Sequence, residues 1–259
     1  MAILTAEGVR VSFGGLQALA GVDLAVDEGT IHGLIGPNGS GKTTLCNVVS
    51  GFYRPHAGRV AFQGRDLTTL PPHEVAVAGI ARTFQDLQVF GEMTALENVL
   101  VGGHCRGRSG VVGAVVKPAA VRREDTAGRE EARAMLASVG LAGLEDRRAN
   151  RLSFGQQRML ELARALVSRP RLLLLDEPAA GLSPAMVERL TGILHALRGE
   201  RGLTILMVEH VIRLVMGISD RITVLDHGER IAEGPPEVIR RDARVIEAYL
   251  GSVLDRAAD

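Results

Sequence analysis

Residues 36–44 read GPNGSGKTT, and this stretch decides the fold. It matches the pattern G-x-x-x-x-G-K-[ST], whose glycines let successive backbone N–H groups curl around phosphate oxygens. The apolar run 30–36 (TIHGLIG) precedes it, and residues 42–51 (KTTLCNVVSG) follow it as a helix stopped by Gly51. A strand, a tight loop and a helix in this order predict a phosphate-binding α/β core, because the helix N-terminus adds partial positive charge.

The lysine of this loop stands out against the composition of the chain. Of 30 basic residues, only Lys42 and Lys117 are lysines, and the rest are arginines. A compact point charge suits a phosphate, so we expect Lys42 to reach the β- and γ-phosphates of a nucleotide and the Thr43 hydroxyl to hold Mg²⁺. The loop residues that we expect to bind the nucleotide are Asn38, Gly39, Ser40, Gly41, Lys42, Thr43 and Thr44.

Two acidic residues end the apolar run within residues 172–178 (LLLLDEP). A strand that is apolar throughout is typical of a parallel sheet buried on both faces, and ligands of such sheets lie at the carboxyl ends of the strands. We therefore expect Asp176 to be a direct or indirect partner of Mg²⁺ and Glu177 to be the base for an attacking water. Taken alone, the pair also fits a helix cap or a solvated turn, and it is the phosphate loop that favours the site.

The composition limits the classes to which the protein can belong. Among 259 residues, 46% are hydrophobic and 23% are charged, and the net charge is zero, without the basic excess of a nucleic-acid binder. No apolar run approaches the roughly eighteen residues of a spanning helix, and no secretory signal is visible. Cys46 and Cys105 offer neither a disulfide framework nor metal-ligand spacing, so packing is the simpler interpretation. We expect a cytoplasmic protein with no membrane anchor of its own.

Strand-like and helix-like segments alternate along the rest of the chain. Further strands are expected at residues 8–13, 22–26, 58–64, 79–84 and 203–210, with a hairpin turning at residues 226–228 within 221–234. Helices with apolar residues at three- and four-residue steps are expected at residues 95–104, 129–141 and 158–170. Residues 105–125 have no clear period and are interpreted as a long loop or a broken helix. This alternation predicts an α/β core with a helical insertion between about residues 93 and 165.

The order of the motifs resembles that of the ATP-binding subunit of an ABC transporter. The phosphate loop is followed by TFQD (83–86), LSFGQ (152–156), LLLLDEP and VEH (208–210), over nearly the whole chain. The resemblance implies an α/β fold, a RecA-like P-loop NTPase core with an antiparallel β subdomain and an inserted α-helical subdomain. Residues 1–92 and 166–259 would form the core with the β subdomain, and residues 93–165 would form the helical subdomain that carries LSFGQ.

Three further site residues are implied by the resemblance. Phe13 resembles the aromatic that stacks on adenine, and His210 resembles the switch histidine at the γ-phosphate. Gln85 resembles the glutamine that senses Mg²⁺ and the attacking water and links the site to the membrane partner. Taken alone, Phe13 fits a buried strand position, Gln85 a polar loop, and His210 a helix cap or a core histidine. The expected catalytic set is therefore Glu177, His210 and Gln85, and the expected Mg²⁺ set is Thr43, Gln85 and Asp176.

Residues 152–157 (LSFGQQ, called the signature turn below) are a second helix start that suits a phosphate. The resemblance implies that two such domains pair head to tail, so that this turn binds the nucleotide of the partner through Ser153, Gly155 and Gln156. Two residues depart from the family pattern. Phe154 replaces the usual glycine, and Ser183 stands where many members have an aspartate that couples the two sites.

Finer features resemble the longer ATPase subunit of branched-chain amino-acid importers, namely EPAAGLSP (177–184), LVMGISDRI (214–222), VIEAYLG (245–251) and the long linker at 103–125. Importers of urea, short amides or other amino acids share much of this pattern and stay an alternative. The resemblance implies ATP and Mg²⁺ as cofactors and membrane permease subunits as partners. It also implies a second ATPase subunit in a heterodimer, with a homodimer as the alternative, and an external solute-binding protein as an indirect partner. Nucleic acid is not expected, and the protein would lie peripherally on the cytoplasmic face of the inner membrane.

Two other classes of function compete with this interpretation. An ABC ATPase that acts on DNA or ribosomes usually carries long coiled-coil arms, two ATPase domains or a basic surface, whereas this sequence has no sustained heptads and one phosphate loop. A scaffold with a dead site is disfavoured by the intact Lys42, Asp176, Glu177 and His210. The basic residues at positions 106–133 alternate with acidic neighbours and are interpreted as a solvated face.

Overall fold

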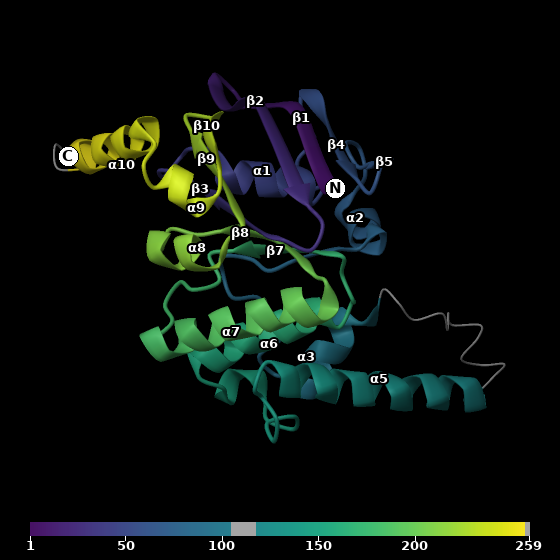
Figure 1. Ribbon diagram of the computed structural model, residues 1–259. Helices are drawn as coiled ribbons and strands as arrows, with labels where there is room; N and C mark the ends of the chain where they lie inside the picture. The colour runs from purple at the N-terminus through teal and green to yellow at the C-terminus, as the bar shows by residue number, and fades with distance from the viewer. Residues whose placement is uncertain (105–117, 257–259) are drawn as a thin grey trace.

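The computed structural model describes residues 1–104 and 118–256, and it describes side chains for residues 1–104 and 126–249. Two sheets form the upper and middle parts of the molecule in Figure 1. A layer of helices lies below them: α3 (Ala95–Gly102), α5 (Pro118–Ser138), α6 (Phe154–Leu166) and α7 (Pro184–Arg201). Residues 105–125 of the linker lie outside the described side chains, and so do most of the basic residues at positions 106–133.

The larger sheet has six strands in the order β10-β9-β3-β8-β7-β6. Their bounds are β3 (Ile31–Ile35), β6 (Ile80–Arg82), β7 (Leu172–Asp176), β8 (Thr204–Val208), β9 (Arg221–Asp226) and β10 (Glu229–Gly234). The first five of these pair in parallel, and β10 closes one edge antiparallel to β9. Every residue of β3, β7 and β8 is buried, as continuous apolar runs of strand length predict. The carboxyl ends of these strands therefore meet at one edge, where the phosphate loop and residues 176–177 begin.

The smaller sheet is antiparallel, with the order β2-β1-β4-β5. Its strands are β1 (Ala2–Phe13), β2 (Leu16–Asp27), β4 (Ala57–Phe62) and β5 (Arg65–Asp66), and β1 and β2 extend well beyond the short runs expected at 8–13 and 22–26. Its apolar face packs with α1 (Lys42–Val49) against one face of the larger sheet in a single core. Cys46 of α1 lies in this core, and burial raises the pKa of its thiol to about 12. The packing interpretation is thus confirmed for Cys46, whereas Cys105 lies outside the described residues.

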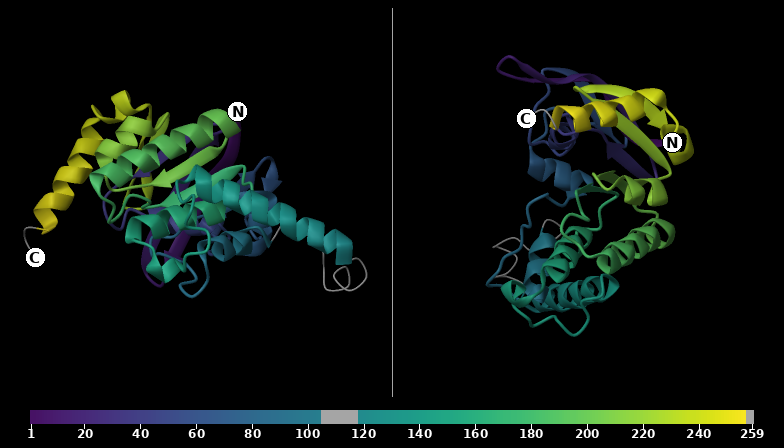
Figure 2. Two further views of the ribbon diagram at one scale, coloured as in Figure 1. Left: turned by 90° about the horizontal axis from the view of Figure 1, so that it is seen from below. Right: turned by 90° about the vertical axis from the view of Figure 1, so that its left-hand side faces the viewer.

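The opposite face of the larger sheet packs against the helical layer. One core cluster joins residues of α3, α5 and α6 to residues of β3, β7, β8 and α7. The smaller helices are α2 (Pro72–Ala78), a 3₁₀ turn (Ala149–Arg151), α8 (Ile212–Ile218), α9 (Pro236–Ile239) and α10 (Ala243–Arg256). Figure 2 shows α5 and α10 extending from opposite sides of the molecule. The division at residues 93 and 165 stays a proposal, because the helical insertion shares its core with the sheet.

Two helices begin earlier than expected. Helix α5 begins at Pro118, so the interpretation of the whole 105–125 stretch as a loop or broken helix is wrong for its last eight residues. Proline is favoured in a first helical turn, and the alanine, arginine and glutamate residues that follow favour a helix. Helix α6 begins at Phe154 rather than near residue 158, because Ser153 caps it. The hairpin between β9 and β10 is confirmed, with positive φ at both His227 and Gly228.

No helix in the described parts of the chain is long and apolar enough to cross a bilayer.

Candidate active site

The phosphate loop leads from the end of β3 into the first turn of α1. Gly36, Gly39 and Gly41 all have positive φ, and a Cβ at Gly41 would lie 2.6 Å from the carbonyl oxygen of Ala18. A larger residue at position 41 would therefore push the loop away from the β1–β2 hairpin. The loop is held as a curl of backbone amides at a helix N-terminus, which is the local structure that the sequence predicts.

Lys42 is the first residue of α1, and its side chain folds back over the loop. Its Nζ donates to the carbonyl oxygens of Gly36 at 2.9 Å and Pro37 at 2.8 Å. Burial lowers the pKa of the ammonium, and the carboxylates of Glu177 and Asp176 oppose this shift. These two hydrogen bonds already place the ammonium above the loop, where phosphate oxygens would bind.

A cleft of about 730 Å³ opens above the phosphate loop, a volume in the range of ligand sites. Three parts of the chain line it: the β1–β2 hairpin, the loop with the start of α1, and the strand ends of the larger sheet. Of the expected site residues, the cleft brings together Phe13, Asn38, Gly39, Gly41, Lys42, Thr43, Thr44, Gln85, Glu177 and His210. Ser40 lies buried behind the loop, where its carbonyl accepts a hydrogen bond from the Gly228 amide.

Glu177 is held from two sides by residues that are far from it in sequence. One carboxylate oxygen lies 2.8 Å from Nε2 of His210, and the other accepts a hydrogen bond of 3.1 Å from Nε2 of Gln85. Glu177 also has a positive φ of 49°, which is uncommon for a residue with a side chain and is found preferentially at functional sites. The carboxylate is therefore oriented toward the cleft rather than free to rotate, as a general base requires.

Asp176 makes a buried ion pair that the sequence did not predict. Its Oδ2 lies 2.9 Å from Nη2 of Arg82, and both side chains are less than a tenth exposed. Arg82 also donates to Asn47 and to Ser50, at 2.7 Å and 2.8 Å. In the sequence, Arg82 is visible only as the one charged residue of the expected strand 79–84. The structure pairs this strand with the buried strand β7 that ends at Asp176.

The oxygen atoms near Asp176 fit the expected Mg²⁺ site. The second carboxylate oxygen, Oδ1, is buried without a hydrogen-bond partner in the structure, and such an atom is uncommon unless a ligand completes it. Thr43 and Gln85 line the adjoining cleft and supply a hydroxyl and an amide oxygen. Hard oxygen ligands with few carboxylates suit Mg²⁺, which takes most of its other ligands from phosphates and water. Within the described residues, no group of three or more His, Cys, Asp or Glu side chains forms a separate metal site.

Phe13 and His210 are exposed, contrary to the buried alternatives that the sequence left for them. Phe13 is 47% exposed, and its ring meets the edge of Tyr53 at a centroid distance of 5.3 Å. The alternative of a buried strand position is therefore wrong for Phe13. The His210 side chain is 40% exposed, so the alternative of a core histidine is wrong as well.

The signature turn lies outside this cleft. The Ser153 hydroxyl accepts from the Gln156 amide at 3.3 Å, and the Gln156 side chain accepts from the Ser153 amide at 2.9 Å. This reciprocal capping box satisfies two amides at the start of α6. The structure of one chain does not bring Ser153, Gly155 and Gln156 together with the phosphate loop.

Both departures from the family pattern have local contacts. The Phe154 ring is 47% exposed and packs beside Gly181, where an added Cβ would lie 2.9 Å from the ring. The guanidinium of Arg158 stacks over the same ring at 5.5 Å. The Ser183 hydroxyl accepts from the Met186 amide at 3.4 Å and caps α7. Ser183 therefore has a structural role that the sequence analysis missed, although a serine before a proline at a helix start is a recognised cap signal.

Comparisons with known proteins agree with this geometry. A family model described as ABC transporter matches residues 19–180, and a second, described as branched-chain amino acid ATP-binding cassette transporter, matches residues 229–255. A high-affinity branched-chain amino acid transport ATP-binding protein of Pseudomonas aeruginosa is 44% identical over 96% of this chain and 98% of its own length. A probable branched-chain amino acid transport ATP-binding protein of Archaeoglobus fulgidus is 40% identical over 97% and 96% of the two chains. The crystal structure of the ADP conformation of an ATP-binding cassette superposes with a TM-score of 0.84 at 38% identity, covering 97% of this chain and 99% of that one.

Proposed function

The chain belongs to the ABC transporter family as an ATP-hydrolysing subunit, and we propose that it drives the uptake of branched-chain amino acids through partner permeases. The match of residues 229–255 to a model specific to branched-chain amino acid transporters supports this solute, as do the relatives at 40–44% identity. Importers of urea, amides or other amino acids are the alternative. The observation that carries the ATP-hydrolysing role is the oriented Glu177 carboxylate beside an intact phosphate loop.

The geometry supports one assignment of roles in ATP hydrolysis. Lys42 and the amides of residues 38–44 hold the phosphates, and Phe13 offers an exposed ring to the adenine. Glu177 takes a proton from the attacking water, while Gln85 and His210 hold its carboxylate toward the cleft. Thr43, Asp176 and Gln85 would hold Mg²⁺, which supplies neutralisation of charge on the β- and γ-phosphates.

The signature turn serves the second nucleotide of a dimer in this proposal. Ser153, Gly155 and Gln156 lie at a helix N-terminus away from the cleft of their own chain, so they reach a γ-phosphate only across an interface. Hydrogen bonds to a charged oxygen contribute about 1.5–3 kcal/mol each. Several of them across two sites would close the dimer while the γ-phosphate is present, and hydrolysis would let it reopen. The second subunit is another ATPase in a heterodimer, or a second copy of this chain.

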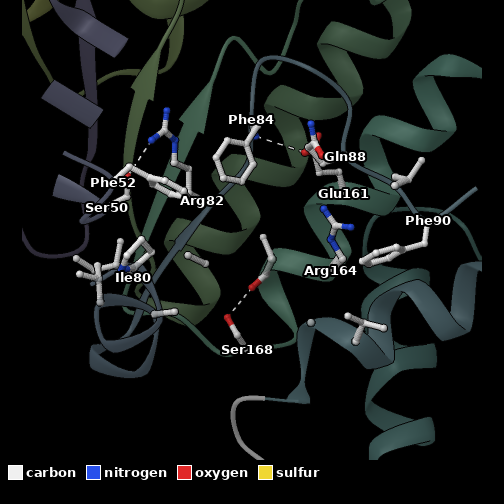
Figure 3. A pocket seen from close by; sticks show the side chains of 18 residues that line it. Ser50, Phe52, Ile80, Arg82, Phe84, Gln88, Phe90, Glu161, Arg164 and Ser168 are labelled. Carbon is white, nitrogen blue, oxygen red and sulfur yellow. Dashed lines mark hydrogen bonds between the residues drawn. The ribbon is translucent and has the colours of Figure 1, made fainter. Parts of the chain in front are cut away.

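A groove of about 730 Å³ beside Gln85 is the surface that we assign to a cytoplasmic segment of the permease. The loop that follows Gln85 forms one wall through Gln88 and Phe90, and α6 forms another through Glu161 and Arg164 (Figure 3). Exposed Phe52, Phe90 and Val101 give the groove an apolar floor suited to a partner helix. Binding there would hold the protein peripherally on the cytoplasmic face of the inner membrane, and an external solute-binding protein would act only through the permease.

A pull-down from membranes tests the proposal. The tagged Glu177→Gln variant, which should retain ATP, is incubated with detergent-solubilised native membranes, ATP and Mg²⁺, and its partners are identified by mass spectrometry. The Lys42→Ala variant, which should not bind nucleotide, is the control. Recovery of polytopic permease subunits, followed by leucine uptake into vesicles containing the complex, supports the proposal. Recovery of ribosomal or DNA-repair components alone would reject transport, and uptake of urea or an amide without leucine would reject the solute.

A further inference from the structure

A buried ion pair on α6 lies outside the cleft. Arg158 and Glu161 are 7% and 2% exposed, and their side chains meet at 3.2 Å. Burying two charges costs several kcal/mol per ion unless further hydrogen bonds complete them. Neither residue lines the cleft, and Glu161 contributes to the wall of the groove beside Gln85. A groove wall does not require a buried ion pair, so the pair needs a separate explanation.

The other hydrogen bonds of Arg158 and Glu161 described here go to backbone atoms of Phe84 and Gln85. Arg158 donates through Nη1 to the carbonyl oxygen of Phe84 at 2.9 Å and through Nη2 to that of Gln85. Glu161 accepts from the Phe84 amide at 3.4 Å, as the dashed line in Figure 3 shows. The rigid fork of a guanidinium can hold two neighbouring carbonyls at once, whereas a lysine ammonium is a single point donor. The backbone at Gln85 is therefore fixed from one side by α6.

The Gln85 side chain leaves this clamped backbone toward the catalytic carboxylate. Its Nε2 lies 3.1 Å from Oε2 of Glu177, so a small rotation of the backbone at position 85 would break the contact. The same Arg158 guanidinium stacks over the Phe154 ring in the signature turn. Arg158 thus contacts both the signature turn and the backbone of Gln85, whose side chain orients Glu177.

We propose that Arg158, completed by Glu161, is a positioning residue that sets the contact between Gln85 and Glu177 and couples it to the orientation of α6. A shift of α6 when the signature turn engages the partner subunit moves the Phe84 and Gln85 carbonyls with it. The Gln85 side chain then approaches or leaves the carboxylate of its own site. This inference rests on the proposed role of Gln85 in hydrolysis.

Two buried polar atoms lie where Arg158 approaches the sheet. Nε of Arg158 and Oγ1 of Thr83 are both buried without a hydrogen-bond partner in the structure. Both residues line a cavity of about 10 Å³, close to the size that holds one water molecule. The cavity lies between Arg158 and Thr83, the residue that follows β6 two positions before Gln85.

A double-mutant cycle tests the inference on the purified full chain. Arg158→Lys keeps the charge but loses the fork, so we expect kcat for ATP to fall about fivefold to tenfold while KM stays within about twofold. In the Gln85→Ala background, the same substitution should lower kcat by less than about twofold, because the contact it positions is already gone. Arg198→Lys is the matched control. Arg198 also donates to a backbone carbonyl (Gly29, 3.2 Å) and to a carboxylate (Asp220, 2.7 Å), and none of these residues lines the cleft. This substitution should leave kcat unchanged.

The outcomes of this cycle distinguish a failure of the positioning role of Arg158 from a failure of the proposed role of Gln85. Equal losses in both backgrounds, or no loss on Arg158→Lys alone, would overturn the positioning role while leaving that of Gln85 intact. Unchanged kcat in Gln85→Ala itself would overturn the proposed role of Gln85 and this inference with it. Should Arg158→Lys fold poorly, Glu161→Gln replaces it in the same cycle, since a glutamine still accepts from the Phe84 amide but removes the charge that fixes Arg158.

Discussion

His210 lies with its Nε2 2.8 Å from Oε1 of Glu177. The two residues follow neighbouring parallel strands, β8 and β7, and are 33 positions apart in the sequence, counted from 177 to 210. Glu177 extends from the end of its strand with a left-handed backbone, which turns its carboxylate into the cleft. A carboxylate held in this way has few orientations to lose when a water approaches.

Glu177→Gln should bind ATP and hydrolyse it about a hundredfold more slowly or worse, because glutamine keeps the shape of the side chain but cannot take a proton. Phosphate release under saturating ATP and Mg²⁺, with binding followed by a fluorescent ATP analogue, measures both properties. Glu188→Gln, at an exposed position on α7, is the control. Near-normal turnover in Glu177→Gln would remove Glu177 from the role of base.

Lys42→Ala should lose nucleotide binding, since no other side chain in the loop offers a compact positive charge to the phosphates. Titration calorimetry with ATP and Mg²⁺ measures the affinity, and circular dichroism checks that the helix content is kept. The Lys42 ammonium now bonds two loop carbonyls, so Lys42→Arg, which is bulkier, should not restore binding. An unchanged ATP affinity in Lys42→Ala would contradict the assignment of the phosphate loop.

Arg82→Met should destabilise the protein by about 3–5 kcal/mol, because it leaves the Asp176 carboxylate buried without its partner. Urea unfolding gives the free energy of unfolding at neutral pH. The double variant Arg82→Met with Asp176→Asn should recover part of this loss, since the uncompensated charge is removed. A loss below about 1 kcal/mol for Arg82→Met would show that water or a cation already compensates Asp176.

Gly181→Ala should destabilise the protein by roughly 2 kcal/mol through two separable effects. Gly181 has a φ of 73°, which costs an alanine about 1 kcal/mol, and the added Cβ would lie 2.9 Å from the Phe154 ring. Gly202→Ala is the matched control, because Gly202 has a φ of 61° but no atom within 4 Å of the added Cβ, so only the backbone effect remains. In a Phe154→Ala background the Gly181→Ala loss should shrink toward that of the control, and an undiminished loss would mean that the ring is not the obstacle.

His32 should make the protein less stable below neutral pH. Burial lowers the pKa of its imidazole to about 4, with Arg221 acting in the same direction and Glu233 and Asp27 opposing it. The unfolded chain, with a histidine pKa near 6.5, binds the proton first, so stability is fully present above that pH and falls as pH drops toward 4. Between pH 7 and pH 5 the loss from this group is about 2 kcal/mol.

Urea unfolding of wild type and His32→Gln at pH 5, 6 and 7 isolates this contribution. The glutamine can still bond Thr223, whose hydroxyl lies 2.8 Å from Nε2 of His32, but it does not titrate. The pH dependence of the free energy of unfolding should therefore be flatter in the variant. Parallel curves for the two proteins would assign the acid sensitivity to other groups.

Much of this molecule follows from local sequence. The phosphate loop, the fully apolar strands β7 and β8 and the β9–β10 turn are each specified within about ten residues, since glycine conformations and side-chain patterns act at short range. The cap formed by Ser153 and Gln156 was also readable, because a serine followed three positions later by a glutamine is the capping-box pattern. Missing that pattern placed the start of α6 four residues too late.

The contacts that decide the chemistry were not readable from any local stretch. Gln85 and Glu177 are 92 positions apart, Arg82 and Asp176 are 94 apart, and Arg158 reaches the Gln85 carbonyl across 73. The first two pairs meet because β6 and β7 are neighbours in the sheet although they are far apart in the sequence. The third meets because α6 packs beside β6 and the segment that follows it. Sequence alone therefore identified the candidate residues for the reaction. The tertiary structure decided which of them touch, because hydrogen bonds and ion pairs act over a few ångströms in space and are independent of separation along the chain.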